Sequence, residues 1–332
     1  MSPPGWLSFH LYYYETLLRP ILRFVRPAVV ELLQSEAIDR FFFIRYGLGG
    51  PHIRLRLQPA PGRHGEVEAQ VRKQAAELLE QSPSNSNLTR EALEKSTQAM
   101  LASDPHETDG NVYPDNSLLE VPFRPETNRY GGPELLEASL DFFTVSSLEA
   151  LAFLNRHSGA PKSRQLPWMF RLLFRQAVGF AAGLDELNSI LRYAEISWGK
   201  EFPNIVEKAD ATFQAQRDTF ISLLEEEIRI CFAEPSPRPV LLEAARLLGH
   251  ATKAVNSDRR WVIGGSQLHM TANRMAASNP EEVYLSRLLF RAWEDLQAAK
   301  PPDSAWIGSE PAAGPETFEV SRWTKQRIAE LI

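Results

Sequence analysis

The chain has 332 residues, of which 43% are hydrophobic and 10% aromatic, and a formal net charge of −6. This content suffices for a substantial core and excludes a disordered chain, and the acidic balance argues against a dedicated nucleic-acid binder. The single cysteine, Cys231, excludes a disulfide framework and a thiolate metal cluster, and its apolar helical context predicts a buried structural thiol. The N-terminus lacks the pattern of a signal peptide and no uncharged apolar run is long enough to span a membrane, so we expect a cytoplasmic protein.

The first 35 residues predict a strand and a helical segment. Trp6 to Tyr14 alternates loosely and is rich in aromatic residues, which is typical of a strand. Leu18 to Ser35 has helical spacing, but Pro20 and Pro27 interrupt it. Because proline removes a backbone donor and clashes with the preceding turn, we expect this helix to break in two or to start late.

The clearest strands are Asp39 to Tyr46 and His52 to Leu57, joined by the sequence GLGGP. The glycines favour an antiparallel hairpin over a phosphate loop, because a strand follows them and Pro51 lacks a donor. Period-two alternation gives the second strand two different faces. The basic face carries His52, Arg54 and Arg56, and the apolar face carries Ile53, Leu55 and Leu57. The basic face is either an ordinary solvated surface or a site for an anion, since arginine binds carboxylates and phosphates bidentately.

Helical patterns dominate the rest of the chain. An amphipathic helix over Glu66 to Gln81 and a further helix over Leu88 to Ala102 precede a loop over 104–116. An extended segment then ends in a turn, with Pro133 at the start of the next helix. Seven further helices are predicted, followed by a C-terminal segment: Glu134 to His157, Leu166 to Leu184, Leu187 to Ser197, Asn204 to Phe232, Pro239 to Asn256, Gly265 to Ala276, Glu281 to Ala298, and Phe318 to Ile332. The fold class is therefore α+β, with a small antiparallel N-terminal sheet containing a hairpin and a mostly helical C-terminal half. We expect one domain over 1–332, sheet-rich over 1–130 and helical over 131–332.

Two further stretches carry polar groups at suggestive spacing. In RPETNRYGGP, Glu126 and Arg129 either pair with each other or contribute to a functional site. Tyr130 precedes two glycines, which suggests a side chain aimed into a cleft. In SQLHMTANRM, His269 lies one helical turn before Asn273, with Arg274 on roughly the same side. A histidine on a helix is more often packed or at the surface than catalytic.

Metal and nucleotide chemistry have no support in the sequence. The motifs H-E-x-x-H, C-x-x-C, G-x-S-x-G and the P-loop are absent, and the seven histidines are scattered without metal-ligand spacing. We therefore expect no metal and no cofactor.

Taken in order, the stretches WLSFHLY, FFFIRY with GPHIRLRL, PETNRYGG and LHMTANR resemble the lantibiotic dehydratase C-terminal family, also called the thiopeptide-type bacteriocin biosynthesis domain. The resemblance runs from Trp6 to about Trp293. Full-length dehydratases carry a larger N-terminal glutamylation domain, so the chain looks like the stand-alone form.

The resemblance implies glutamate elimination. A Ser or Thr of a precursor peptide is first esterified with glutamate from glutamyl-tRNA, and this domain then removes the α-proton and expels glutamate, leaving dehydroalanine or dehydrobutyrine. By motif, Arg56, Arg129 and His269 are the expected catalytic groups, because cations stabilise the developing enolate and carboxylate and histidine can take or relay the proton. The expected substrate-binding residues are Arg54, Glu126, Arg274, His52 and Tyr130.

Two other functions stay open. Similar stand-alone members of the family look like pyridine synthases, which join two dehydroalanines in a formal aza-[4+2] cycloaddition and release the leader peptide. A third interpretation is a non-catalytic module that binds the leader peptide, which a free edge on the His52 to Leu57 strand would favour. Elimination ranks first because the sequence contains the whole elimination motif set.

The expected partners follow from the same resemblance. They are a ribosomally made precursor peptide with its leader and a separate glutamyl-tRNA-dependent glutamylating enzyme. Neither membrane contact nor direct nucleic-acid contact is expected, and a homodimer is compatible with such a scaffold.

Overall fold

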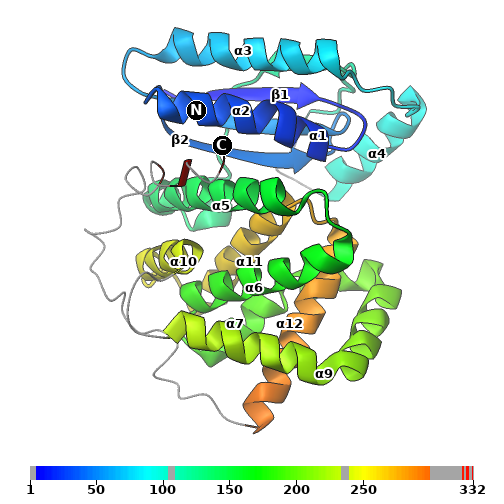
Figure 1. The fold of residues 1–332 in the computed structure, drawn as a ribbon, viewed down its shortest axis with the longest axis vertical. Helices are drawn as coiled ribbons and strands as arrows, with labels where there is room; N and C mark the ends of the chain where they lie inside the picture. Colours follow the sequence, from blue (N-terminus) through cyan, green and yellow to red (C-terminus); the bar gives the residue numbers. More distant parts are fainter. Residues whose placement is uncertain are drawn as a thin grey trace. The chain divides into compact units, whose positions relative to one another are not determined.

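The computed structural model describes residues 5–103, 109–232 and 239–299, together with Thr324, Arg327, Ile328 and Leu331. Most of the expected C-terminal segment Phe318 to Ile332, and residues 233–238, lie outside the described residues. The chain divides into two compact units, which are treated separately: Met1–Glu126 with Ala150–Arg156 and Val320–Ile332, and Thr127–Glu149 with His157–Glu319. The predicted α+β class is confirmed, with one antiparallel sheet near the N-terminus followed by helices (Figure 1).

The first unit contains a four-stranded antiparallel sheet in the order β2-β3-β1-β4. Its strands are β1 (Leu7–Tyr12), β2 (Ile38–Tyr46), β3 (His52–Pro59) and β4 (Ser117–Glu120). The expected hairpin joins β2 and β3, and Gly49 and Gly50 within it have φ angles of +75° and +119°, which glycine adopts without a steric penalty. Because β3 pairs with a strand on each side, it is not the free edge that would have favoured a leader-binding module.

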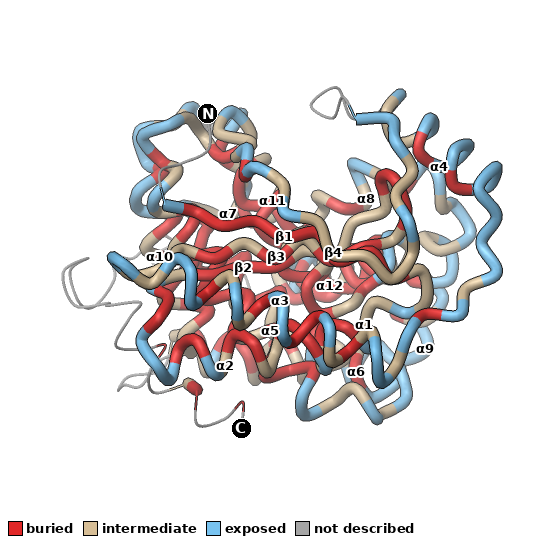
Figure 2. Tube along the Cα trace, turned by 90° about the horizontal axis from the view of Figure 1, so that it is seen from above, coloured by how far each residue is buried: buried red, intermediate tan, exposed pale blue. Residues whose placement is uncertain are grey.

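The two faces of this sheet differ in chemistry. The inner strand β1 is buried along its whole length (Figure 2). The strand register aligns buried apolar residues on one face, including Phe9 with Leu55 and Leu55 with Phe43. Arg72 of α3 lies over the ring of Phe9, with 5.8 Å from Cζ to the centroid, so α3 (His64–Gln81) covers this apolar face. The same register aligns polar and aromatic side chains on the opposite face: Ser8, His10 and Tyr12 of β1, His52, Arg54 and Arg56 of β3, and Phe42 and Tyr46 of β2.

The two prolines do not break the helical segment between β1 and β2. It runs through α1 (Leu18–Pro20), a π-helical stretch (Ile21–Val25) and α2 (Arg26–Gln34). The expected break in two is therefore wrong, whereas the longest α-helix of the segment does start late, at Arg26. Pro20 falls in the first turn, where its missing N–H needs no partner, and Pro27 falls at the start of α2. The wider π-helical turn lies directly before Pro27 and accommodates its ring. This unit also contains α4 (Arg90–Ser103).

The second unit is helical. Its short 3-10 turns are η2 (Thr127–Tyr130), η3 (Pro133–Leu135) and η4 (Gly199–Glu201). Its α-helices are α6 (Lys162–Phe180), α7 (Leu184–Leu191), α8 (Tyr193–Trp198), α9 (Pro203–Phe232), α10 (Val240–Ala251), α11 (Ser257–Arg274) and α12 (Asn279–Ala299). Residues of α5 (Leu136–His157) belong to both units. Three expectations differ from this. The predicted helix over Leu187 to Ser197 is two helices that meet at Arg192, α9 is kinked at Gln216, and α11 begins eight residues before Gly265.

The early start of α11 has a local cause. The side chain of Asn256 accepts a hydrogen bond from the backbone N–H of Asp258 at 2.8 Å, which caps the helix. Gly264 and Gly265 lie inside α11 and let other side chains approach its backbone: a Cβ at Gly265 would lie 2.1 Å from Cδ2 of Tyr193. Gly265, where the helix was expected to begin, is therefore a packing position inside it. Among the described residues, no helix combines the length and hydropathy needed to cross a membrane.

Candidate functional site

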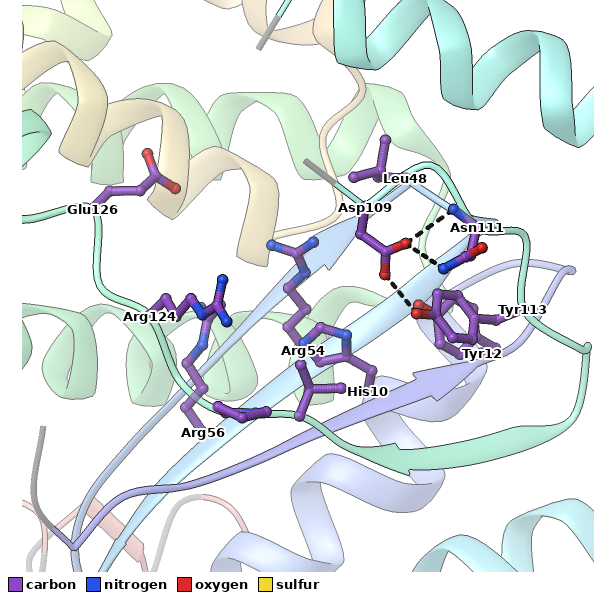
Figure 3. Close-up of a pocket in the computed structure, with 12 residues that line it drawn as sticks. His10, Tyr12, Leu48, Arg54, Arg56, Asp109, Asn111, Tyr113, Arg124 and Glu126 are labelled. Atoms are coloured by element: carbon purple, nitrogen blue, oxygen red, sulfur yellow. Dashed lines mark hydrogen bonds between the residues drawn. The ribbon is translucent and has the colours of Figure 1, made fainter. Parts of the chain in front are cut away.

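The polar face of the sheet forms the floor of a pocket of about 310 Å³ (Figure 3). Arg54 and Arg56 rise from β3 into this pocket, and the segment after β4 adds Arg124. Two carboxylates, Asp109 and Glu126, also line it. The basic face of β3 is therefore part of a cationic pocket that includes acidic groups, and such a pocket suits a ligand with at least one carboxylate.

Arg56 is oriented by aromatic rings. Its Cζ lies 4.7 Å from the ring centroid of Phe123 and 5.2 Å from that of Phe42, its cross-strand neighbour. The rings of Phe42 and Phe123 also contact Trp6, at centroid distances of 5.7 and 5.4 Å. Guanidinium stacking on aromatic faces fixes the plane of the group while its N–H edges stay able to bind an anion.

Arg54 is oriented differently. Its Nε–H donates to Nε2 of His52 at 3.1 Å, and its Cζ lies 3.8 Å from the ring centroid of Tyr46. His52 is itself fully buried, its Nδ1 lies 2.8 Å from the carbonyl oxygen of Gly50, and it is not among the residues that line the pocket. The predicted contact between His52 and substrate stays a prediction.

His10 is a pocket residue that the motifs did not indicate. It lies on β1 directly opposite Arg54, and its ring stacks on that of His52 at 4.9 Å between centroids. Burial lowers the pKa of His10 far below its usual value, and the neighbouring His52, Arg54 and Arg56 lower it further. The imidazole is therefore neutral at neutral pH. The only sequence signal was its place in an alternating strand, on the face opposite Phe9 and Leu11.

One side of the pocket is a hydrogen-bonded loop. Asp109 accepts hydrogen bonds from the Tyr113 hydroxyl at 2.5 Å and from the Asn111 side chain at 2.8 Å (Figure 3). Burial alone would raise the pKa of Asp109, but these hydrogen bonds outweigh it and lower the value. The ring of Tyr113 stacks on Tyr12 at 4.9 Å, which attaches the loop to the sheet.

In the second unit, Arg129 lies against α11. Its Nε donates to Oγ of Ser266 at 3.3 Å, and the hydroxyl of Tyr193 lies 3.0 Å from the same oxygen. Ser266 and His269 are one helical turn apart, so they lie on one face of α11. Arg129 and His269, two of the expected catalytic residues, are thus associated with the same face of α11.

His269 is paired with a carboxylate that the sequence did not indicate. Its Nδ1 lies 2.8 Å from Oε2 of Glu282 on α12, and the ring contacts Trp198 at 4.6 Å between centroids. Because a carboxylate only accepts hydrogen bonds, Nδ1 carries the proton and the neutral ring keeps its lone pair at Nε2. Both side chains are mostly buried, at 13% and 7% exposure. This is the arrangement in which a carboxylate orients a histidine for proton transfer.

Tyr130 and Arg274 meet at a different place. The ring of Tyr130 lies 5.0 Å from that of Phe143, and Cζ of Arg274 lies 4.9 Å from the same ring. Arg274 is fully buried and donates to Oγ of Ser146 at 3.0 Å. These contacts join the Tyr130 turn and the end of α11 to α5, and substrate binding by either residue stays a prediction.

The predicted site residues therefore divide between the two units. The first unit holds His52, Arg54, Arg56 and Glu126, and the second holds Arg129, Tyr130, His269 and Arg274. Among the residues that the structure describes, no cluster of three or more histidine, cysteine, aspartate or glutamate side chains is suited to a metal ion.

Comparison with solved structures identifies proteins of the same fold. The pyridine synthase TbtD from thiomuracin biosynthesis aligns with a TM-score of 0.70 at 20% identity, over 89% of this chain and 99% of that chain. The structure of TsrL aligns with a TM-score of 0.56 at 17% identity, over 93% of this chain and 99% of that chain. The tRNA-dependent lantibiotic dehydratase MibB from Microbispora sp. 107891 aligns with a TM-score of 0.51 at 17% identity, over 90% of this chain but 29% of that protein.

No curated protein matches the sequence. A family described as the lantibiotic biosynthesis dehydratase C-terminal domain does, over residues 6–293. This range contains every motif on which the resemblance rested, so the predicted family is confirmed. The chain belongs to the lantibiotic biosynthesis dehydratase C-terminal family, whose members are biosynthetic enzymes.

Proposed function

We propose that this protein is a lyase that eliminates glutamate from glutamylated Ser or Thr residues of a ribosomally made precursor peptide. The observation that carries the proposal is the hydrogen bond between His269 and Glu282. The reaction needs a base for an α-proton of low acidity, and a histidine whose Nδ1–H is held by a carboxylate offers Nε2 as that base.

The chemistry follows from this pairing. Nε2 of His269 takes the α-proton of the esterified residue, and the electron pair of the Cα–H bond becomes the Cα=Cβ double bond. The Cβ–O bond breaks, and glutamate leaves as a carboxylate. Glu282, 2.8 Å from Nδ1, would keep the ring oriented during the transfer and lie beside the imidazolium that forms.

The arginines supply the other requirement, which is stabilisation of negative charge. Arg54, Arg56 and Arg124 line one pocket with neutral His10, so this pocket would hold carboxylate groups of the glutamyl moiety. Arg129, which reaches the His269 face of α11 through Ser266, would stabilise the enolate-like oxygen. The glutamylated peptide would come from a separate glutamyl-tRNA-dependent enzyme.

Pyridine formation is the second candidate. The observation in its favour is the alignment with TbtD over 99% of that chain, which concerns the fold. Elimination ranks higher because the chain contains the whole set of elimination motifs, and because His269 of that set is paired with a carboxylate.

The deciding experiment offers the protein two substrates in separate reactions followed by mass spectrometry. One is a linear peptide glutamylated at a single Ser, and the other is an azole-containing peptide with two dehydroalanines and its leader. Loss of glutamate from the first peptide, with the second unchanged, is the expected result. Leader release from the second peptide would establish the cyclase instead, and binding without turnover of either peptide would indicate a recruiting module.

His269→Ala tests the proposed base directly. This variant should accumulate glutamylated peptide, and His250→Ala, at an exposed histidine on α10, is the matched control. Full elimination by His269→Ala would show that another group removes the proton.

A further inference from the structure

We propose that His52 is a positioning residue for Arg54, in place of the direct substrate contact that its motif implies. His52 would act as a fixed, neutral hydrogen-bond acceptor that sets the direction in which Arg54 presents its guanidinium to the pocket. The inference deepens the proposed function, on which it rests only for the identity of the ligand.

The first step concerns the tautomer of His52. The Gly50 carbonyl oxygen, 2.8 Å from Nδ1, can only accept, so Nδ1 carries the proton. Nε2 then keeps its lone pair and accepts from Nε–H of Arg54 at 3.1 Å. Gly50 has a φ angle of +119°, and a Cβ there would lie 2.4 Å from the ring of Tyr14, so a glycine is required where the carbonyl is aimed at His52.

The second step concerns Arg54. Its Nε–H is used by His52, and its guanidinium is stacked on the ring of Tyr46 with 3.8 Å from Cζ to the centroid. These two contacts fix both the rotation and the plane of the group. The edge of the guanidinium away from His52, with its terminal nitrogens, is then presented to the pocket that Arg54 lines. A preoriented fork loses less entropy when it binds a carboxylate.

The third step explains why His52 can serve as an acceptor beside two arginines. Its ring is fully buried and contacts the rings of Tyr12, at 4.5 Å, and His10, at 4.9 Å between centroids. Burial and the charge of Arg54 hold the pKa of His52 at about 3. A protonated ring would point an N–H at the N–H of Arg54, and the alignment would be lost. The groups around His52 therefore keep it in the one protonation state that orients Arg54.

The test uses four variants of the full chain: His52→Phe, His52→Gln, Arg54→Lys and the double variant of His52→Phe with Arg54→Lys. Phenylalanine keeps an aromatic ring in the stack but has no acceptor, whereas the glutamine amide oxygen can replace Nε2. Lysine has no Nε–H for His52 to orient. His64→Phe, at an exposed histidine of the same unit, is the control, and thermal melting confirms that each variant is folded.

Hydrogen exchange of the Arg54 Nε–H, followed by NMR on protein with ¹⁵N-labelled arginine, requires no ligand. The signal is assigned by its loss in Arg54→Lys. Exchange should be slow in the wild type, in His52→Gln and in the His64→Phe control, and fast in His52→Phe. Fast exchange in the wild type would overturn the inference.

Calorimetric binding of L-glutamate then tests the consequence. His52→Phe should weaken binding by about 10-fold, the size of one hydrogen bond to a charged group, and His52→Gln should restore most of it. In the Arg54→Lys background the same substitution should change binding by less than about 2-fold. Equal losses in both backgrounds would show a purely structural role and overturn the inference. A wild-type protein that binds L-glutamate but eliminates no glutamate from the glutamylated peptide would refute only the proposed function. If the wild-type protein binds no L-glutamate, the exchange measurement decides the role of His52.

Discussion

His269 and Glu282 are joined by a hydrogen bond of 2.8 Å between Nδ1 and Oε2, although they belong to different helices, α11 and α12. The side chain of Glu282 is 7% exposed and His269 has Trp198 against its ring, so the pair is shielded from water on most sides. A histidine oriented in this way presents one defined nitrogen, because the carboxylate holds the other.

Glu282→Gln should therefore lower the rate of elimination more than it lowers substrate affinity. The amide has no charge to stabilise the imidazolium, and its NH₂ group can turn toward Nδ1 and invert the tautomer. We expect kcat to fall by about 10²- to 10⁴-fold, the range for general base catalysis, with KM changed little. The measurement is the rate at which a glutamylated peptide loses glutamate, by mass spectrometry.

Glu294→Gln provides the matched control on α12. Glu294 is exposed and pairs with Arg291 at the surface, so its substitution should leave kcat unchanged. A Glu282→Gln enzyme that retained wild-type kcat would exclude the carboxylate from proton transfer.

Arg56→Lys should impair binding even though the positive charge remains. Lysine cannot form two parallel hydrogen bonds to a carboxylate, and it replaces a flat guanidinium that lies against Phe42 and Phe123. We expect the affinity for L-glutamate to fall by about 10-fold, on the scale of one charged hydrogen bond. Calorimetry at two salt concentrations provides the measurement, and an unchanged affinity would mean that Arg56 acts only through its charge. Arg90→Lys is the control, since Arg90 is exposed on α4 and pairs with Glu94.

Part of this site could be predicted from local sequence. The alternation of His52 to Leu57 predicted a strand with a basic face, and the structure confirms the strand and its hairpin. What the pattern could not give was the register of the neighbouring strands, which places His10 opposite Arg54 and Phe42 opposite Arg56. Register depends on pairing between distant segments, and it decides which side chains surround each arginine.

The helical half shows the same limit. Helical periodicity indicated which residues share a face with His269, but a partner on another helix has no periodic relation to it. Glu282 therefore gave no signal, although it lies 13 positions away. Proline was misjudged for a related reason, because its cost depends on whether its N–H would have had a partner, and at Pro20 and Pro27 the local geometry removes that cost.

Gly265→Ala should destabilise the protein and disturb the site. A Cβ at this position would lie 2.1 Å from Cδ2 and 2.2 Å from Cγ of Tyr193, so the ring must move. Overpacking of this kind costs about 1–3 kcal/mol in the free energy of unfolding, and it would also displace the Tyr193 hydroxyl from Ser266. Urea denaturation measures the loss. Gly159→Ala is the control because a Cβ at Gly159 would have no neighbour within 4 Å, and equal stability of the two variants would contradict the close packing.

The protein should lose stability in mild acid through His10 and His52. In the folded protein both histidines have pKa values below the ordinary 6.5, and that of His52 is about 3. Below pH 6.5 the unfolded chain therefore binds protons that the folded chain does not. The free energy of unfolding then falls as pH falls below about 6.5, by about 1.4 kcal/mol per pH unit for each histidine. Because the two rings are stacked and face Arg54 and Arg56, protonating one disfavours protonating the other.

Urea denaturation at several pH values between about 7 and 5 should show a clear dependence of the free energy of unfolding on pH in the wild type and a weaker one in His52→Gln. The control His250→Gln, at an exposed histidine, should behave as the wild type. Parallel slopes for wild type and His52→Gln would mean that His52 takes up its proton equally in both states, contrary to its burial among these groups.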